Sequence, residues 1–161
     1  MTLSTSLPTT FVVGDSTFAI GVEPGASARE VNVTVTANGR FTWTVRQPAW
    51  RPMSFGCGEG TGYLWSARSL LVLPQNAAQD PLVIDIDEDL VFAFKLPARW
   101  VLVCETSVRL HTEDGEATRL ELGEVVEQAR WEDGVLVLFD PDGRPTRVTV
   151  GEGITVTPDT H

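Results

Sequence analysis

The chain has 161 residues, of which 42% are hydrophobic, and its 12 basic and 22 acidic side chains give a formal net charge of −10. This length is typical of one folded unit, so we predict a single domain over residues 1–156 and a flexible tail over 157–161. The acidic balance argues against nucleic-acid binding, which needs a basic surface, and against docking on anionic membranes.

The first residues predict a soluble, cytoplasmic protein. They lack the basic segment and apolar run of a signal peptide. The longest apolar runs, such as those at 90–94 and 135–139, hold five residues, whereas a membrane helix needs about 20. Cys57 and Cys104 are therefore expected to be reduced thiols. Arginine supplies 11 of the 12 basic residues, which favours a bacterial source with a GC-rich genome.

Residues 31–45 predict the first β-hairpin. Valine alternates with polar residues over 31–36, and Phe41, Trp43 and Val45 alternate with threonine and arginine after the Asn38–Gly39 turn. A three-residue loop over 37–39 keeps the apolar side chains on one face, with Trp43 opposite Val33 and Gly39 in the left-handed conformation.

Residues 40–65 concentrate the side chains that dominate binding hot spots, which are arginine, tryptophan and tyrosine. Two of them lie in a proline-bracketed loop at 47–52, where side chains are presented to partners. The alternative is a loop folded back so that its tryptophan covers the core. The predicted binding residues are Arg46, Trp50, Arg51, Tyr63 and Trp65.

Catalytic chemistry has few candidates in this sequence. Cys57 lies in the glycine-rich segment 56–62, which lacks the spacing of a nucleotide-binding loop. A catalytic thiol needs a base, and the internal candidate is His111, on the polar phase of its strand and expected to face solvent. We therefore predict a protein that is not an enzyme, with an enzyme using Cys57 as the least favoured alternative.

The acidic run 85–89 is interpreted as a strand edge and turn. An EF-hand beginning at Asp85 would need glycine and glutamate where Leu90 and Leu96 stand. No Cys-x-x-Cys motif or histidine pair offers a zinc site. No cofactor or bound metal is expected.

The C-terminal third predicts a meander of antiparallel strands, joined by Asp-Gly turns at 114, 133 and 142. Residues 135–139 are apolar at every position, which indicates burial on both faces. A weak repeat places 82–103 over 118–139 with an offset of about 36 residues. A propeller of four blades leaves no room for the dissimilar first sixty residues. With 20 valines and 18 threonines, the chain predicts an antiparallel β-sandwich or flattened barrel of hairpin meanders with very little helix.

Charge is unevenly distributed along the chain. Residues 1–58 carry a net charge of +1, and residues 105–161 carry −8. An acidic C-terminal surface steers basic partners. We predict a binding module acting through protein–protein contacts, as an adaptor, an assembly subunit or an inhibitor of a basic protein. The alternative is a β-domain that binds a small molecule or carbohydrate. Unpaired edge strands would also permit a homo-oligomer.

Overall fold

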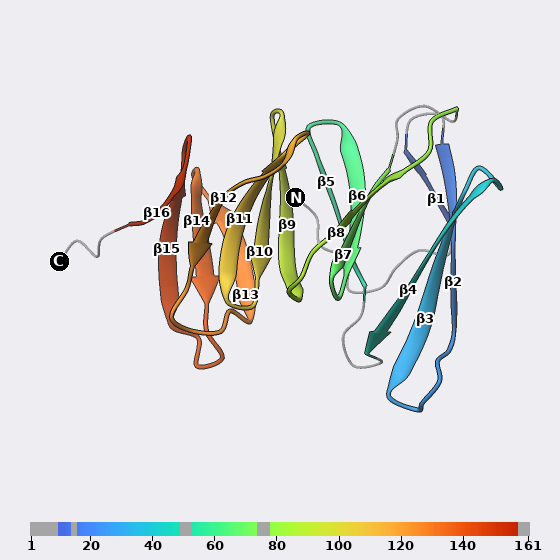
Figure 1. Cartoon of the computed structure of the whole chain (residues 1–161), viewed down its shortest axis with the longest axis horizontal. Coiled ribbons are helices and arrows are strands. Elements are labelled where there is room, and N and C mark those ends of the chain that lie inside the picture. The colour runs from blue at the N-terminus through green and yellow to red at the C-terminus, as the bar shows by residue number, and fades with distance from the viewer. Residues whose placement is uncertain (1–9, 14–15, 49–52, 74–77, 158–161) are drawn as a thin grey trace. The chain divides into compact units, whose positions relative to one another are not determined.

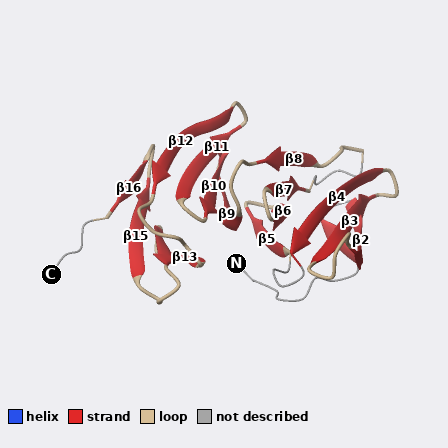
Figure 2. Ribbon diagram, turned by 60° about the horizontal axis from the view of Figure 1, so that its bottom comes forward, coloured by secondary structure: helices blue, strands red, loops and turns tan. Residues whose placement is uncertain are grey.

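The computed structural model describes residues 10–13, 16–48, 53–73 and 78–157. In these ranges every regular element is a β-strand, and sixteen strands form four sheets of four (Figures 1 and 2). Each strand pairs antiparallel with the next one in the same sheet, so every sheet is a simple meander. The predicted fold class, mainly β and built from antiparallel hairpins, is confirmed.

The described chain divides into two compact units, Met1–Asp87 and Glu88–His161, here called unit 1 and unit 2. Unit 1 holds sheet 1, made of β1 (Thr10–Val13), β2 (Ser16–Pro24), β3 (Glu30–Ala37) and β4 (Phe41–Pro48), and sheet 2, made of β5 (Ser54–Gly58), β6 (Thr61–Ser66), β7 (Ser69–Val72) and β8 (Leu82–Asp85). Unit 2 holds sheet 3, made of β9 (Leu90–Leu96), β10 (Arg99–Cys104), β11 (Ser107–Thr112) and β12 (Gly115–Glu121), and sheet 4, made of β13 (Gln128–Glu132), β14 (Val135–Phe139), β15 (Pro145–Val150) and β16 (Ile154–Val156).

The core of unit 1 lies between sheets 1 and 2. Alternate residues of β3 and β4, such as Val33, Val35 and Trp43, point into it. Leu64 and Leu71 of sheet 2 meet them there with no exposed surface. The opposite face of sheet 1 is polar, because threonine fills the intervening positions of both strands. Sheet 1 therefore needs an apolar neighbour on one face only.

The first hairpin has the predicted three-residue loop, but its register differs from the prediction. Ala37 pairs with Phe41 and Val35 pairs with Trp43, so the loop spans 38–40 rather than 37–39. The partner of Trp43 is thus Val35 instead of the predicted Val33, two residues away along β3. Each side chain stays on its predicted face, because side chains two residues apart in a strand point to the same side. Asn38 and Gly39 both have positive φ, of 52° and 71°. The asparagine accepts the left-handed conformation, which moves the loop one residue onward.

Unit 2 packs sheet 3 against sheet 4 through aromatic and branched side chains. Phe94 of β9 meets Trp131 of β13, with ring centroids 5.6 Å apart, and Phe92 stacks on Phe94 at 4.6 Å. Leu136 and Leu138 of β14 are buried in the same layer. The Asp-Gly turn predicted between the strands at 128–131 and 135–139 is present, and because Glu132 pairs with Val135 its loop has two residues. Its two central residues, at 133 and 134, have φ of 47° and 80°.

The weak sequence repeat has a structural counterpart. An offset of 36 residues carries β8, β9 and β10 onto β12, β13 and β14, which occupy the same places in consecutive sheets. The expectation that the first sixty residues lie outside this pattern is wrong, because sheet 1 is a four-stranded meander like the others. Such a meander also forms the blade of a propeller. Within each unit two of these sheets pack face to face, as in a sandwich.

The single domain predicted over 1–156 can be tested by unfolding. Leu64→Ala in unit 1 and Leu136→Ala in unit 2 each remove a fully buried side chain, at a cost of about 2–5 kcal/mol. In a single domain both variants shift one common urea transition, followed by tryptophan fluorescence and far-UV circular dichroism. Val22→Ala, at a 62% exposed position, is the control and should leave the midpoint unchanged. Two transitions that move independently would contradict a single domain.

Candidate functional site

The predicted binding residues do not form one surface cluster in the described structure. Trp50 and Arg51 lie outside the described residues. Arg46 lies on β4 with a 68% exposed side chain, and its guanidinium is 4.0 Å from the carboxylate of Glu30. At such exposure this ion pair contributes little to stability and leaves the arginine accessible.

Tyr63 and Trp65 are buried in β6 rather than displayed. Their exposed fractions are 0% and 3%, and their rings stack with centroids 5.9 Å apart. Gly56 lies opposite Tyr63 in the register, and a Cβ at that glycine would stand 2.8 Å from the tyrosine ring. The glycine-rich segment therefore gives this ring its space in the β5–β6 hairpin. A ligand-binding role of the two rings stays a prediction, and in this structure both belong to the protein interior.

The two cysteines have different environments. Cys57 is exposed on β5, and Cys104 is buried at the end of β10, as predicted for a small core residue. Burial raises the pKa of the Cys104 thiol to about 11, so it stays protonated at neutral pH. His111, the base considered for Cys57, lies on β11 in the other unit.

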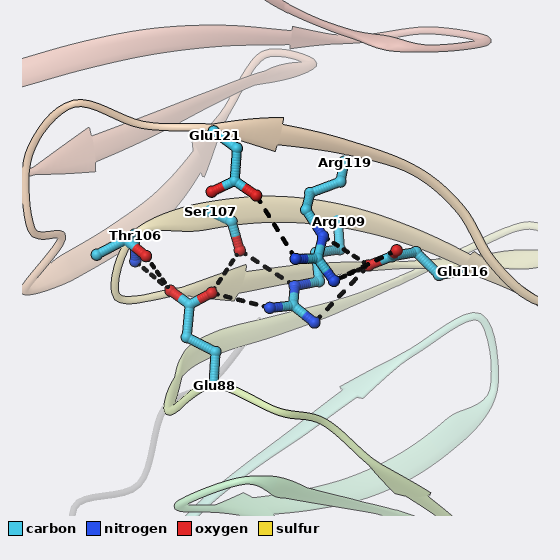
Figure 3. Close-up of polar contacts among 7 residues, drawn as sticks. All are labelled: Glu88, Thr106, Ser107, Arg109, Glu116, Arg119 and Glu121. Carbon is cyan, nitrogen blue, oxygen red and sulfur yellow. Dashed lines mark hydrogen bonds and ion pairs between the residues drawn. The ribbon is translucent and has the colours of Figure 1, made fainter.

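A polar network is built on the face of sheet 3 that points away from sheet 4 (Figure 3). Its centre is Glu88, which lies two residues before the start of β9. One carboxylate oxygen accepts hydrogen bonds from the backbone N–H and, at 2.7 Å, the hydroxyl of Thr106. The other accepts them from the Ser107 hydroxyl at 2.8 Å and the Arg109 guanidinium at 2.9 Å. The side chains of Arg109 and Glu88 are only 5% and 19% exposed, so water competes weakly with this ion pair.

The network extends across the β11–β12 pair with alternating charge. Arg109 and Arg119 stand directly opposite each other, which would be repulsive by itself. Glu116 lies between them, at 3.7 Å from the first guanidinium and 3.0 Å from the second. Glu121 contacts the second arginine at 3.5 Å. The arginines and glutamates of this network neutralise one another, so we assign the network a structural role in holding β11, β12 and the segment before β9 together.

Burial raises the pKa of Glu88, but the hydrogen bonds from Thr106, Ser107 and Arg109 together hold it below its usual value of 4.5. His111 follows Arg109 on the same face of β11 and is half-buried rather than fully solvent-facing as predicted. Burial lowers the pKa of His111 below 6.5, and the two nearby arginines act in the same direction against Glu116. Its Nε2 atom is buried without a hydrogen-bond partner among the residues described.

A surface pocket of about 170 Å³ lies in unit 2, where the connection between β12 and β13 passes β14. Its lining combines apolar side chains with three carboxylates and no basic residue: Glu121, Leu122, Gly123, Glu124, Val125, Val126, Leu138, Phe139, Asp140, Thr146 and Val156. Val125 and Val156 are 48% and 50% exposed, so part of the apolar lining faces solvent. We call this feature the acidic pocket.

Backbone hydrogen bonds fix the wall of the acidic pocket. The N–H of Val126 donates to the carbonyl of Glu105 at 2.7 Å, and the N–H of Glu127 donates to that of Phe139 at 2.8 Å. This pocket was not predicted from the sequence, because the extended connection over 122–127 lies outside the strands and Asp-Gly turns on which the predictions relied. The available signal was the mixture of three glutamates with Leu122, Val125 and Val126 over 121–127.

Within the described ranges, no three histidine, cysteine, aspartate or glutamate residues gather in a way that could hold a metal ion. Those ranges also contain no helix with the length and apolar character needed to span a membrane.

Neither protein-family models nor curated proteins match this sequence. Among solved structures, two similar chains come from crystals of BBS1N in complex with ARL6DN, one soaked with mercury and one with lead. The first has 12% identity and a TM-score of 0.44 over 88% of this chain and 54% of its own length. The second has 13% identity and a TM-score of 0.44 over 95% and 57%. The present chain thus spans little more than half the length of either.

Removing the buried guanidinium should destabilise the fold. Arg109→Leu leaves the Glu88 carboxylate without its ionic partner, and we expect a loss of about 3–5 kcal/mol in the free energy of unfolding. The double variant Arg109→Leu/Glu88→Gln should lose less free energy of unfolding than the two single variants lose in sum. Urea denaturation of all four proteins measures this difference as a double-mutant cycle. Arg144→Leu, at an exposed turn position, is the matched control. Additive losses would show that the two groups are not coupled.

Stability should fall in two separate steps on acidification. His111 has a lowered pKa, so the unfolded state binds its proton first and stability declines as pH falls below 6.5. The contribution of Glu88 is present above 4.5 and is lost as pH falls further. His111→Gln should flatten the melting temperature between pH 7.5 and 5.5 while leaving the second step. An unchanged profile in that range would contradict the assignment.

Proposed function

We propose that the chain is a non-enzymatic binding module that acts through protein–protein contacts, and that a basic segment of its partner binds the acidic pocket. The supporting observation is the lining: three carboxylates stand around apolar side chains, with no arginine or lysine among them. An apolar side chain flanked by cationic ones matches this lining in both polarity and charge. Toward this partner the chain acts as an adaptor, an assembly subunit or an inhibitor.

The size of the pocket favours a side chain over a whole small molecule. Sites for drug-sized ligands usually enclose about 300–1,000 Å³, and the acidic pocket has about 170 Å³. That space fits one leucine- or valine-sized group. Of the aromatic residues considered for a carbohydrate site, Tyr63 and Trp65 are buried and Trp50 lies outside the described residues. Both observations favour the protein-binding proposal over the small-molecule alternative.

The charge of unit 2 supports a cationic partner. Residues 105–161 carry a net charge of −8. Arg109 is bound to Glu88 and Glu116, and Arg119 is bound to Glu116 and to the pocket-lining Glu121, so the negative charge of the pocket rim is carried mainly by Glu124 and Asp140. Excess negative charge around a small apolar site raises the local concentration of a basic segment and speeds its association.

The pentapeptide Gly-Arg-Leu-Arg-Gly, with blocked ends, is a minimal probe of this proposal. In ¹H–¹⁵N spectra of the labelled protein it should shift amide signals over 121–126 and 138–140. Glu124→Lys should weaken binding at least about threefold by replacing an attraction with a repulsion. The matched control is Glu113→Lys, which makes the same charge change in the β11–β12 turn outside the pocket.

The acidic peptide Gly-Glu-Leu-Glu-Gly tests the sign of the interaction. It should produce no shifts at the pocket under the same conditions. Equal shifts from both peptides, or shifts that Glu113→Lys and Glu124→Lys weaken equally, would contradict a specific basic partner at this pocket.

A further inference from the structure

Strand β12 is a free edge of sheet 3, and it ends at the acidic pocket. The sheet order places β11 on one side of β12, and no described strand pairs with it on the other side. Glu121, the last residue of β12, and the following Leu122 both line the pocket. The other edge strand at the pocket, β16, has only three residues, whereas β12 has seven. A partner segment in the pocket therefore lies beside an open strand edge.

The hydrogen bonds of β12 show which of its backbone groups point to the free edge. The N–H of Leu122, directly after β12, donates to the carbonyl of Thr106, directly before β11, at 2.9 Å. Hydrogen-bonded and non-hydrogen-bonded pairs alternate along two antiparallel strands. The register has no shift over 118–121. The backbone N–H and C=O groups of Arg119 and Glu121 therefore point away from β11, toward the free edge.

The side chains of β12 give the free edge two different sides. Leu120 pairs with the fully buried Val108, and Leu122 lines the pocket, so one side is apolar. The side chains of Arg119 and Glu121 lie on the other side, in the network of Figure 3, and contact each other at 3.5 Å. In the whole strand two glutamates oppose one arginine, so charge favours a basic segment at this edge.

We propose that the basic segment of the partner binds as an extended strand that adds antiparallel to the free edge of β12, with one apolar side chain in the acidic pocket. This inference rests on the proposed function, because the pocket supplies the attraction for a basic segment. The segment residue opposite Leu122 directs its side chain to the pocket side. The next residue lies opposite Glu121, where its backbone exchanges hydrogen bonds with the strand and a basic side chain forms a cross-strand ion pair.

The free edge also determines the preferred partner sequence beyond the pocket. The second residue after the one in the pocket lies opposite Leu120 and favours an apolar side chain. The third lies opposite Arg119, where another cation would add to a positive charge, so a neutral or acidic side chain is preferred. From its N-terminus the segment thus reads basic, apolar, basic, apolar, and then neutral or acidic.

Peptide extension tests the added strand. The blocked peptide Gly-Arg-Leu-Arg-Val-Thr-Val-Gly continues the pentapeptide along β12 and should bind at least about tenfold more tightly, because it gains backbone hydrogen bonds at Arg119. Its ¹H–¹⁵N titration should add shifts over 117–119. The control Gly-Val-Thr-Val-Arg-Leu-Arg-Gly has the same composition but extends in the opposite direction, and it should bind like the pentapeptide.

N-methylation locates the backbone hydrogen bonds. A methyl group on the threonine amide of the extended peptide removes a donor that points to β12, and it should abolish the tenfold gain. A methyl group on the amide of the valine before it points away from β12 and should leave the affinity within about twofold. Glu121→Pro removes an outward N–H of the protein and should also abolish the gain. Glu121→Gln removes the same charge but retains this N–H, so the gain should persist.

The outcomes separate this inference from the proposed function. If the pentapeptide binds at the pocket but extension gives no gain, or both methylated peptides bind equally, the added strand is overturned and the proposed function stands. If no peptide binds at the pocket, both are overturned. A larger gain from the control extension overturns the antiparallel direction.

A second copy of the chain is the competing occupant of this edge. Sedimentation velocity of the wild type should show no rise in mass with concentration that Glu121→Pro removes, and such a rise would overturn the proposal. Far-UV circular dichroism and urea unfolding verify that Glu121→Pro is folded. If it is not, the two methylated peptides decide the result.

Discussion

A four-stranded sheet with apolar residues on both faces cannot be stable by itself, and this constraint organises the whole chain. The sheets are too narrow to enclose a core, so each apolar face must be covered by another layer. Sheet 1 solves the problem by alternation, since Val33, Val35 and Trp43 face inward and threonines face out. Sheet 4 does not, because Val135, Val137 and Phe139 lie on a face covered by arginine stems rather than by a sheet. The same constraint thus explains the cores of both units.

The Arg109–Glu88 ion pair shows how a charge can be accepted in an otherwise apolar sheet. Arg109 stands in β11 between Val108 and Leu110, both almost fully buried. Its burial is tolerable because Glu88 binds the guanidinium while Thr106 and Ser107 satisfy the remaining carboxylate lone pairs. The network joins the segment that enters β9 to β11, so electrostatics and backbone topology fix the same part of unit 2.

Most of the secondary structure could be predicted from local sequence patterns. The candidate site could not, because it depends on contacts between residues that are distant in the sequence. Asn38–Gly39 and Asp133–Gly134 mark their turns because few other residue pairs accept positive φ, although the first register was displaced by two residues. The burial of Tyr63 was not visible, because its ring rests on Gly56 across a hairpin. Arg109 was overlooked although a lone charge in an apolar strand demands a partner. That partner lies 21 residues away in the sequence, at a glutamate no local pattern distinguishes.

The ion pairs show where the excess negative charge of unit 2 lies. Arg109, Arg119, Arg130 and Arg147 of unit 2 are all bound to carboxylates of their own sheet, or of the segment entering it. Their positive charge is therefore concentrated on the Glu88–Arg109 network of sheet 3 and beside Glu132 of sheet 4. The rim of the acidic pocket, with Glu124 and Asp140, retains its negative charge beside exposed valines. Acidity spread evenly over a surface serves solubility. Acidity separated from the basic side chains of the same unit instead concentrates negative potential at one place, which in unit 2 is the acidic pocket.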